Sequence, residues 1–216
     1  MTPKTKHNGE TRAMHRFALF TAAGLGSIAI SSAHAGLYPP AAPPDSAYVR
    51  VFNDTTQGKL NAQIGDKSVP DPSPLDASGY VFLPPGKYDA KIGGKSESLA
   101  LDSKRCYTAA LAADGIHVFD QDCFNSQLKS LISVYNLIDG TTLSVKAGAG
   151  GPAVVDGVAS DKSAHREVNP VKATLTVFNG DTKLADAKPV ALERGKVYSL
   201  FITGTTSAPV LTWVVN

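Results

Sequence analysis

The chain has 216 residues, of which 43% are hydrophobic and 19% charged, and its formal net charge at pH 7 is +2. The basic excess lies in the first 35 residues. Without them, lysines and arginines fall from 21 to 17 and acidic residues from 19 to 18, so the net charge becomes −1. No basic stripe remains that would indicate binding to nucleic acid or to an anionic membrane surface.

The first 35 residues have the three parts of a secretory signal peptide. The basic part contains Lys4, Lys6, Arg12 and Arg16. An apolar run from Phe17 to Ile30 follows, and small residues stand at positions 33 and 35. At 14 residues this run is shorter than the roughly 17–25 residues of a membrane-spanning helix. We therefore predict cleavage before Gly36 rather than a membrane anchor, and Met14 is an alternative start to Met1.

Residues 36–46 contain four prolines. Proline fixes φ and removes a backbone donor, so this segment is predicted to be extended and polyproline-like. It would serve either as a strap along the following domain or as a docking segment for a partner.

From residue 47 onward the apolar residues alternate with period two, and no window shows the spacing of a surface helix. Val49 and Val51 share one face of the first strand, while Tyr48, Arg50 and Phe52 share the other. Further strands are predicted at 60–64, 80–83, 88–92, 98–101, 106–113, 116–119, 197–203 and 210–215. Short strands separated by turns at this spacing indicate β-sandwiches.

The pattern occurs twice. Val49–Asn53 returns as Ile132–Asn136, 83 positions later, and Tyr88–Ile92 matches residues 173–177. The sequence therefore predicts an all-β fold of two tandem β-sandwich domains, Ig-like or carbohydrate-binding-module-like, at 47–124 and 131–216, with a linker at 125–130. Tyr107 and Tyr198 hold matching places, and each is expected to bond the backbone of a neighbouring strand rather than a ligand.

The two cysteines, Cys106 and Cys123, are predicted to form a disulfide. Asp114-Gly115 between them is a strong signal for a two-residue hairpin turn, because glycine tolerates positive φ. Counting outward from Ala113/Ile116 places Cys106 directly opposite Cys123, in a close pair about 4.5 Å apart at Cα. An exported chain favours oxidation of such a pair. Free thiols or half of a metal site are the weaker alternatives, since no nearby histidine pair completes a tetrad.

The sequence argues against an enzyme. Only His117 and His165 follow the signal peptide, in different copies, and neither is paired with a recognisable nucleophile. His117 is interpreted as a strand side chain and His165 as a solvated one. There is no nucleophile elbow, and Asn179-Gly180-Asp181 is interpreted as a hairpin turn. We expect no catalytic residue, cofactor or metal site.

Two features remain as candidates for binding. Trp213 is a candidate for stacking on sugar rings, as exposed aromatics do in lectin-like sandwiches. Further aromatic candidates for this role alternate with the apolar strand faces, and most are more consistent with core positions: Tyr38, Tyr48, Phe52, Tyr80 and Tyr135. The charged stretch Arg166–Lys172 is interpreted either as a solvated strand edge or as a partner surface.

Several segments together resemble the AlgF family of bacterial alginate O-acetylation: Leu37-Tyr38-Pro39, Val49–Asn53, Arg166–Lys172 and Pro189–Gly195. The similarity extends through the chain after the signal peptide and is strongest in the second half. The cysteine pair is not part of the family pattern. The family carries no catalytic residues that could be transferred to this sequence.

The resemblance implies a periplasmic, non-catalytic adaptor that supports acetylation of mannuronate residues during exopolysaccharide and biofilm synthesis. The partners it implies are a membrane-bound acetyl-transferring protein and SGNH-type periplasmic acetyltransferases. The alternative is a carbohydrate-binding module that contacts alginate directly. We expect the partner surface on the second copy, and its candidate residues are Arg166, Glu167, Asn169, Lys172 and Arg194.

Overall fold

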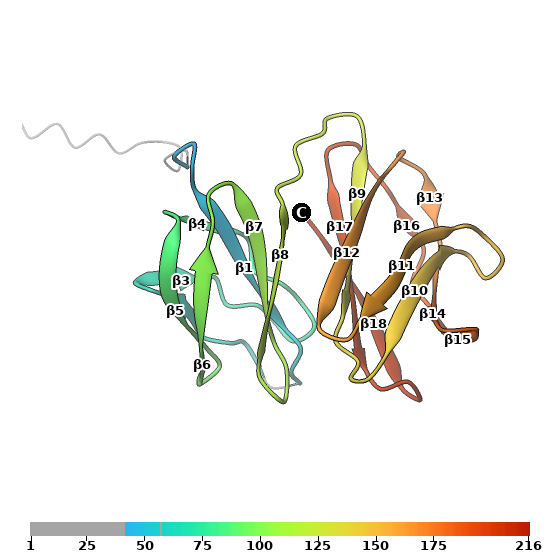
Figure 1. Cartoon of the computed structure of the whole chain (residues 1–216), viewed down its shortest axis with the longest axis horizontal. Coiled ribbons are helices and arrows are strands. Elements are labelled where there is room, and N and C mark those ends of the chain that lie inside the picture. The colour runs from blue at the N-terminus through green and yellow to red at the C-terminus, as the bar shows by residue number, and fades with distance from the viewer. Residues whose placement is uncertain (1–41, 57) are drawn as a thin grey trace, which may run out of the picture. The chain divides into compact units, whose positions relative to one another are not determined.

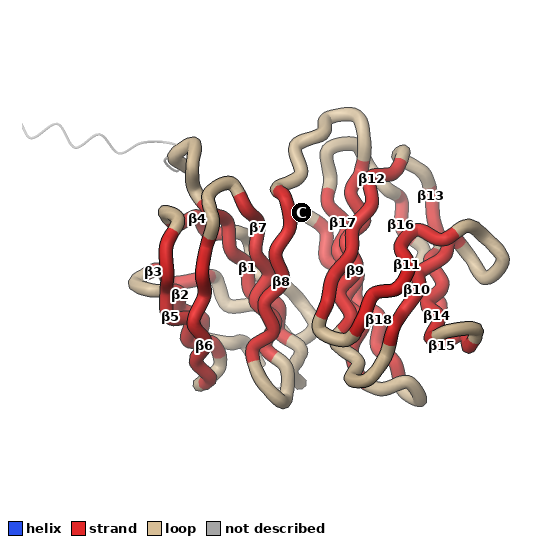
Figure 2. Tube along the Cα trace, in the orientation of Figure 1, coloured by secondary structure: helices blue, strands red, loops and turns tan. Residues whose placement is uncertain are grey.

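The computed structural model describes residues 42–56 and 58–216, which contain strands and loops without a helix (Figure 2). These residues form one compact unit. The predicted signal peptide at 1–35 lies outside the described residues, as does the proline-rich segment up to residue 41. Within the described chain, no helix is long and apolar enough to cross a membrane.

The first half is a β-sandwich of two four-stranded sheets (Figure 1). One sheet has the order β4-β1-β7-β8, with bounds Val81–Leu83, Ala47–Asn53, Arg105–Leu111 and Ile116–Asp122. The other has the order β3-β2-β5-β6, with bounds Lys67–Val69, Ala62–Ile64, Gly86–Ile92 and Lys95–Leu101. Val49 and Val51 of β1 are fully buried against Ile64 and Ile92 of the facing sheet, as the period-two alternation predicts.

The second half repeats this arrangement. One sheet has the order β12-β9-β17-β18, with bounds Lys162–Val168, Ser130–Asn136, Val197–Gly204 and Pro209–Val215. The other has the order β11-β10-β14-β15, with bounds Ala153–Ala159, Thr142–Ala147, Leu175–Asn179 and Thr182–Asp186. Two short strands, β13 (Lys172–Ala173) and β16 (Val190–Ala191), pair separately. The core of this half is built around Val134, Leu143, Val145 and Leu200.

The two halves have the same topology, which confirms the tandem fold read from the repeat. In each, the first strand pairs in parallel with a later one: β1 with β7 and β9 with β17. The predicted tyrosine role is also confirmed, because Tyr107 Oη accepts the N–H of Asp102 (2.8 Å) and Tyr198 Oη accepts that of Glu193 (2.9 Å). Each tyrosine therefore fixes the turn that precedes its strand.

The predicted strand bounds differ from the observed ones mainly at polar ends. β6 begins at Lys95 rather than Ser98, and β8 continues to Asp122 rather than stopping at Phe119. β3 was not predicted, because two of its three residues are polar and exposed. The turn at Asn179-Gly180-Asp181 is confirmed, since β14 and β15 meet with Asn179 opposite Thr182.

The disulfide between Cys106 and Cys123 is present, with the Cα atoms 5.1 Å apart, but the predicted register of its hairpin is wrong. Leu111 lies opposite Ile116, so Cys106 faces Gln121 and Cys123 lies just beyond β8. The closing pair is Ala112 and Gly115, not Ala113 and Ile116. A shift of two residues keeps every side chain on its predicted face, so the cysteines still meet, on the diagonal.

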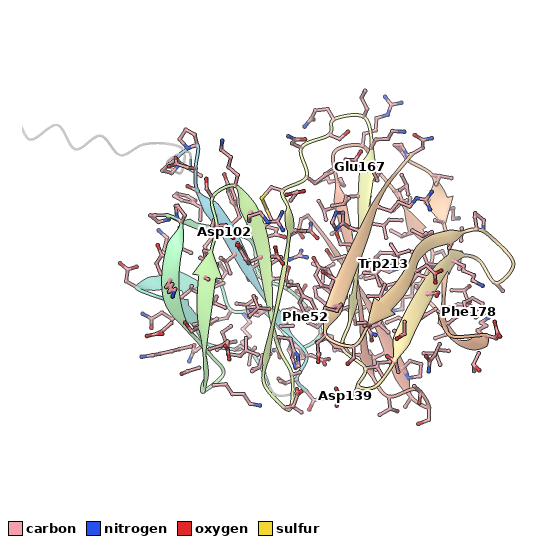
Figure 3. The ribbon with its side chains drawn as sticks, in the orientation of Figure 1. Phe52, Asp102, Asp139, Glu167, Phe178 and Trp213 are labelled. Atoms are coloured by element: carbon pink, nitrogen blue, oxygen red, sulfur yellow. A yellow bond between two sulfur atoms is a disulfide. The ribbon has the colours of Figure 1, made fainter. Side chains whose placement is uncertain are left out.

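The sheets β4-β1-β7-β8 and β12-β9-β17-β18 contact each other through an aromatic cluster that we call the seam: Phe52, Ala110, Phe119, Tyr135, Phe201 and Val214. The rings of Phe52 and Phe201 are stacked with centroids 3.7 Å apart. Tyr135 stacks on Phe201 at 4.5 Å and meets Phe119 edge-on at 5.2 Å. Phe52 and Tyr135 are thus buried in the seam rather than inside either core. Figure 3 shows Phe52 between the two sandwiches.

Arg50 is fully buried beside this cluster. Its guanidinium donates to Thr108 Oγ1 (3.0 Å), Ser199 Oγ (2.7 Å), Tyr135 Oη (3.2 Å) and Asn216 Oδ1. It also lies over the rings of Tyr80, Tyr135 and Phe201, at 5.1 to 5.8 Å from their centroids. No carboxylate within residues 42–56 and 58–216 accepts from it, so side-chain dipoles and aromatic faces replace the hydration of the charge. Three of its four hydrogen-bond partners belong to the second half.

Arg50→Ala should lower the free energy of unfolding by about 3–5 kcal/mol, because it leaves buried hydroxyls unpaired and opens a cavity. The wild type should unfold in one calorimetric transition, whereas the variant should show two, one for each sandwich. Lys91→Ala, on an exposed position of β5, is the control and should change stability by less than about 0.5 kcal/mol. A single, unshifted transition in Arg50→Ala would contradict this role of the seam.

The disulfide closes a loop with a sequence separation of 17. Loop-closure entropy predicts that the paired replacement of Cys106 and Cys123 by serine costs about 3 kcal/mol. Denaturant titrations of the variant and of the oxidised wild type measure this difference. Reduction of the wild type should reproduce it, and equal midpoints in all three samples would show that the disulfide does not stabilise the fold.

Candidate functional site

A cavity of about 590 Å³ opens where loops of both sandwiches meet at one end of the seam. Its walls include residues 54–56 after β1 and residues 137–139 after β9, which are equivalent positions of the two copies. Four carboxylates line it: Asp54, Asp114, Asp139 and Asp161. The cavity therefore presents negative charge, and it carries one histidine, His117.

His117 is held between two of these carboxylates. Its Nε2 lies 2.9 Å from Asp114 Oδ1 in the same hairpin, and its Nδ1 lies 2.8 Å from Asp161 Oδ1 in the second sandwich. Asp161 occupies the left-handed region (φ 57°) in the turn between β11 and β12, a conformation that aspartate tolerates better than most residues. Both ring nitrogens can donate to carboxylates only in the imidazolium form.

The pKa values of two carboxylates of the cavity, Asp54 and Asp114, are shifted in opposite directions. The hydrogen bond from His117 lowers the pKa of Asp114. Burial raises the pKa of Asp54, a half-buried residue whose side chain also interacts with Thr203 across the seam. The charge of Asp54 therefore costs stability at neutral pH, whereas that of Asp114 contributes to it.

The two histidines lie on different strands, His117 on β8 and His165 on β12. Both ring nitrogens of His117 lie within hydrogen-bond distance of carboxylate oxygens. His165 is exposed on β12, and the hydroxyl of Ser133 opposite it donates to Gln121 Oε1 (3.1 Å). Within the described residues, no group of three or more His, Cys, Asp or Glu side chains is placed to hold a metal ion.

The predicted partner residues gather near the start of the second sandwich. Lys172 of β13 lies opposite Ala191 of β16, close to the turn that carries Arg194. The linker joins this group, because Lys129 Nζ donates to Asn169 Oδ1 (2.6 Å) and Lys129 O accepts the N–H of Gly195 (2.8 Å). We call this region the linker-end surface: Lys129, Arg166, Glu167, Asn169, Lys172 and Arg194.

Arg166 and Glu167 enter this surface from β12, which forms an edge of its sheet and is largely exposed. Arg166 donates to the carbonyl of Ala153 (2.7 Å). In the described part of the chain its guanidinium forms no ion pair with a carboxylate. Figure 3 shows Glu167 at the opposite end of the second sandwich from Asp139, a wall residue of the cavity. The basic surface and the acidic cavity thus lie at different ends of this sandwich.

Trp213 is partly buried against the second core. Its ring meets that of Tyr198 edge-on at 6.5 Å, and its Nε1 donates to Lys188 O (2.9 Å). Packing accounts for these contacts, and a role in sugar stacking stays a prediction. Val214, its neighbour, points to the other face and joins the seam.

Sequence reasoning did not identify Arg50 as a buried cation or His117 as a bridge. A signal for Arg50 was present, since it stands between Tyr48 and Phe52 on the strand face opposite the core valines. The face of β1 that carries Arg50 must therefore be covered by residues outside the core of the first sandwich. Nothing in the sequence near His117 indicated Asp161, because the two residues are distant along the chain and meet only across the seam.

Asp54→Asn should stabilise the protein at pH 7, because it removes a charge that burial disfavours. When folding raises the pKa of an acid, the native state loses stability as the pH rises from the pKa of the unfolded state to that of the folded state. The advantage of the variant should therefore disappear as the pH falls toward 3.8, the ordinary pKa of this carboxyl. Urea titrations across this range measure it, with exposed Asp89→Asn as the control. A constant difference at all pH values would contradict the assignment.

The comparisons with known proteins agree with one another. The profile of the family described as "Alginate O-acetyl transferase AlgF" matches residues 21–199. The chain is 36% identical over 212 residues to the "Alginate biosynthesis protein AlgF" of Pseudomonas syringae pv. tomato, which covers 97% of this chain and 95% of that protein. It is 35% identical to the protein of the same name from Azotobacter vinelandii, covering 93% and 94%.

Two solved structures are also similar. The C-terminal domain of AlgF from P. aeruginosa is 39% identical and covers 41% of this chain and 99% of its own length, with a TM-score of 0.38. The N-terminal domain of the same protein is 30% identical and covers 38% and 99%, with a TM-score of 0.34. On the family match and the identity to full-length relatives, the chain belongs to the AlgF family of alginate biosynthesis proteins.

Proposed function

We propose that this protein is a non-catalytic periplasmic adaptor of the alginate O-acetylation machinery. It would connect a membrane-bound acetyl-transferring protein with SGNH-type acetyltransferases that modify mannuronate residues of the polymer. Membership of the AlgF family supports the alginate context. The predicted signal peptide supports export to the periplasm.

The observation that carries this proposal is the seam. Arg50 and the stacked rings of Phe52 and Phe201 tie two similar sandwiches into one body. An adaptor needs fixed surfaces at a fixed separation, and a buried, hydrogen-bonded contact provides that better than a flexible linker. The linker-end surface and the acidic cavity then offer two chemically different places for partners.

The geometry favours an adaptor over an acetyltransferase, because the ring nitrogens of His117 are both engaged by carboxylates. It also gives the acidic cavity little affinity for alginate, since uronate carboxylates would meet Asp54, Asp114, Asp139 and Asp161. The linker-end surface is the place where the polymer could still bind directly. Direct polymer binding is therefore kept as an outcome of the test.

The test is affinity capture of the tagged protein from detergent-solubilised envelope of alginate-producing cells. The wild type should recover the membrane-bound acetyl-transferring protein or the SGNH-type acetyltransferases. The double replacement Lys172→Glu and Arg194→Glu should reduce this recovery by about tenfold or more. It would place negative charges opposite the acidic partner surface that these basic residues favour, and like charges across an interface cost affinity. Both residues are exposed, so the fold should be retained.

The matched control is Lys87→Glu with Lys91→Glu, two exposed lysines of β5 in the first sandwich, which should not change recovery. If the wild type recovers no acetylation protein, the adaptor proposal is contradicted. Saturable binding of alginate oligomers by the purified protein, without a protein partner, would replace it with the carbohydrate-binding alternative.

A further inference from the structure

One ion pair crosses the seam in the part of the chain that the structure describes. It joins His117 Nδ1 on β8 to Asp161 Oδ1 of the second sandwich, at 2.8 Å. The other nitrogen of the same ring, Nε2, lies 2.9 Å from Asp114 Oδ1 of the first sandwich. The ion pairs of Arg105 and Lys183 each lie within one sandwich. We call the group Asp114, His117 and Asp161 the His117 bridge.

Both carboxylates of the His117 bridge stand on turns whose backbone is fixed. Asp114 lies in the β7–β8 turn, which is closed by the hydrogen bond from Ala112 N–H to Gly115 O (2.9 Å). Asp161 lies in the β11–β12 turn, and its own N–H donates to Asn136 O (2.9 Å) at the end of β9. The bridge therefore restricts how far the two turns can separate.

The bridge depends on the charge of the ring. A neutral imidazole has one N–H and one lone pair, so it can donate to only one of the two carboxylates. The imidazolium donates to both, through charge-assisted hydrogen bonds. The side chain of His117 is only 14% exposed, so water has limited access to replace a lost partner. Loss of a proton near neutral pH therefore breaks the bridge on one side.

Further carboxylates make this loss more unfavourable. Asp54, in the loop after β1, and Asp139, in the loop after β9, line the same cavity as His117. Burial has the largest effect on the pKa of Asp54 and raises it, and the charge of Asp114 also raises it, whereas that of His117 lowers it. The imidazolium thus offsets part of the repulsion among the four acids of the cavity, and the neutral ring does not.

The other neighbours of the ring do not replace its charge. On β7, the uncharged Ala110 lies opposite His117, and β17, β18 and the turn between them contribute uncharged residues to the cavity wall. Lys95 of β6 reaches the hairpin turn, but its Nζ donates to Ala113 O (2.6 Å). Lys162 begins β12 and is exposed. Neither lysine forms an ion pair with the four acids in the described chain.

We propose that the His117 bridge is a pH-dependent contact that closes one end of the seam. Below about pH 6.5, the ordinary pKa of histidine, the imidazolium binds Asp114 and Asp161 together. As the pH rises, the neutral ring releases one of these carboxylates, and repulsion among the acids widens the cavity. The stacked rings and the Arg50 network keep the sandwiches attached, so only this end loosens. The inference does not depend on the proposed adaptor function.

The sign of the pH dependence follows from linkage. A cation that gains carboxylate partners on folding stabilises the native state below its ordinary pKa, and this contribution is lost as the pH rises. At the acid end, the hydrogen bond from His117 lowers the pKa of Asp114, so that carboxylate keeps its charge below its usual range. The bridge should therefore be formed at pH 5.5 and broken at pH 8.

The first test compares the wild type with His117→Gln, which carries no charge, in urea titrations of residues 36–216 at both pH values. The variant should raise the equilibrium constant of unfolding about fivefold at pH 5.5 and less than about twofold at pH 8, as expected of a partly exposed ion pair. His165→Gln, on an exposed position of β12, is the matched control and should not show this dependence. An equal effect of His117→Gln at both pH values would overturn the proposal.

Asp161→Asn separates charge from backbone conformation. Asparagine also tolerates the left-handed region (φ 57°) and can still accept a hydrogen bond, so the turn should be retained. In the Asp161→Asn background, His117→Gln should change the equilibrium constant at pH 5.5 by only about twofold. A change that stays fivefold would show that the charge of Asp161 has no part in the bridge.

NMR tests the contact across the seam without a variant. The ¹⁵N shifts of the ring should show N–H groups at both nitrogens of His117 at pH 5.5. The backbone amides of residues 160–162 in the second sandwich should then shift with the same midpoint as the ring. These shifts should vanish in His117→Gln and remain in His165→Gln. Amides that do not follow the ring would contradict a contact that responds to its protonation.

Discussion

The burial of Arg50 is the interaction on which the arrangement of the two sandwiches depends. A guanidinium without a carboxylate partner is stable inside a protein only if its donors are satisfied and its charge meets polarisable groups. Here Thr108 comes from the first half, while Tyr135, Ser199 and Asn216 come from the second. Separating the halves would expose the arginine and the stacked rings together. The contact is therefore both a hydrogen-bond network and an apolar interface.

The seam also explains features that neither sandwich accounts for alone. Gln121 is buried at the seam, where it accepts from Ser133 and Tyr135 of the second half. The disulfide ties Cys123, the residue after β8, to β7, and so holds the start of the connection close to the sheet that forms the seam. His117 adds a polar contact at one end through Asp161. These contacts place the acidic cavity at one end of the second sandwich and the linker-end surface at the other.

Much of the fold could be predicted from the sequence, because alternation of apolar residues and the internal repeat are local signals. Val49 and Val51 marked the core face of β1, and the matching tyrosines marked equivalent turns. The cysteine hairpin was predicted in the right place but with the register displaced by two, since a period-two pattern cannot distinguish such shifts. The partners of Arg50 and His117 were not predictable, because they come from the other copy and depend on how two sheets pack face to face.

The seam predicts that both sandwiches behave as one rigid body in solution. The most direct measurement is a set of residual dipolar couplings and ¹⁵N relaxation rates on the isotope-labelled chain from residue 36 to residue 216. One alignment tensor should fit the amides of β1–β8 and β9–β18 together, with the same rotational correlation time for both halves. Two tensors, or a shorter correlation time for either half, would show that the sandwiches reorient independently and would contradict the account.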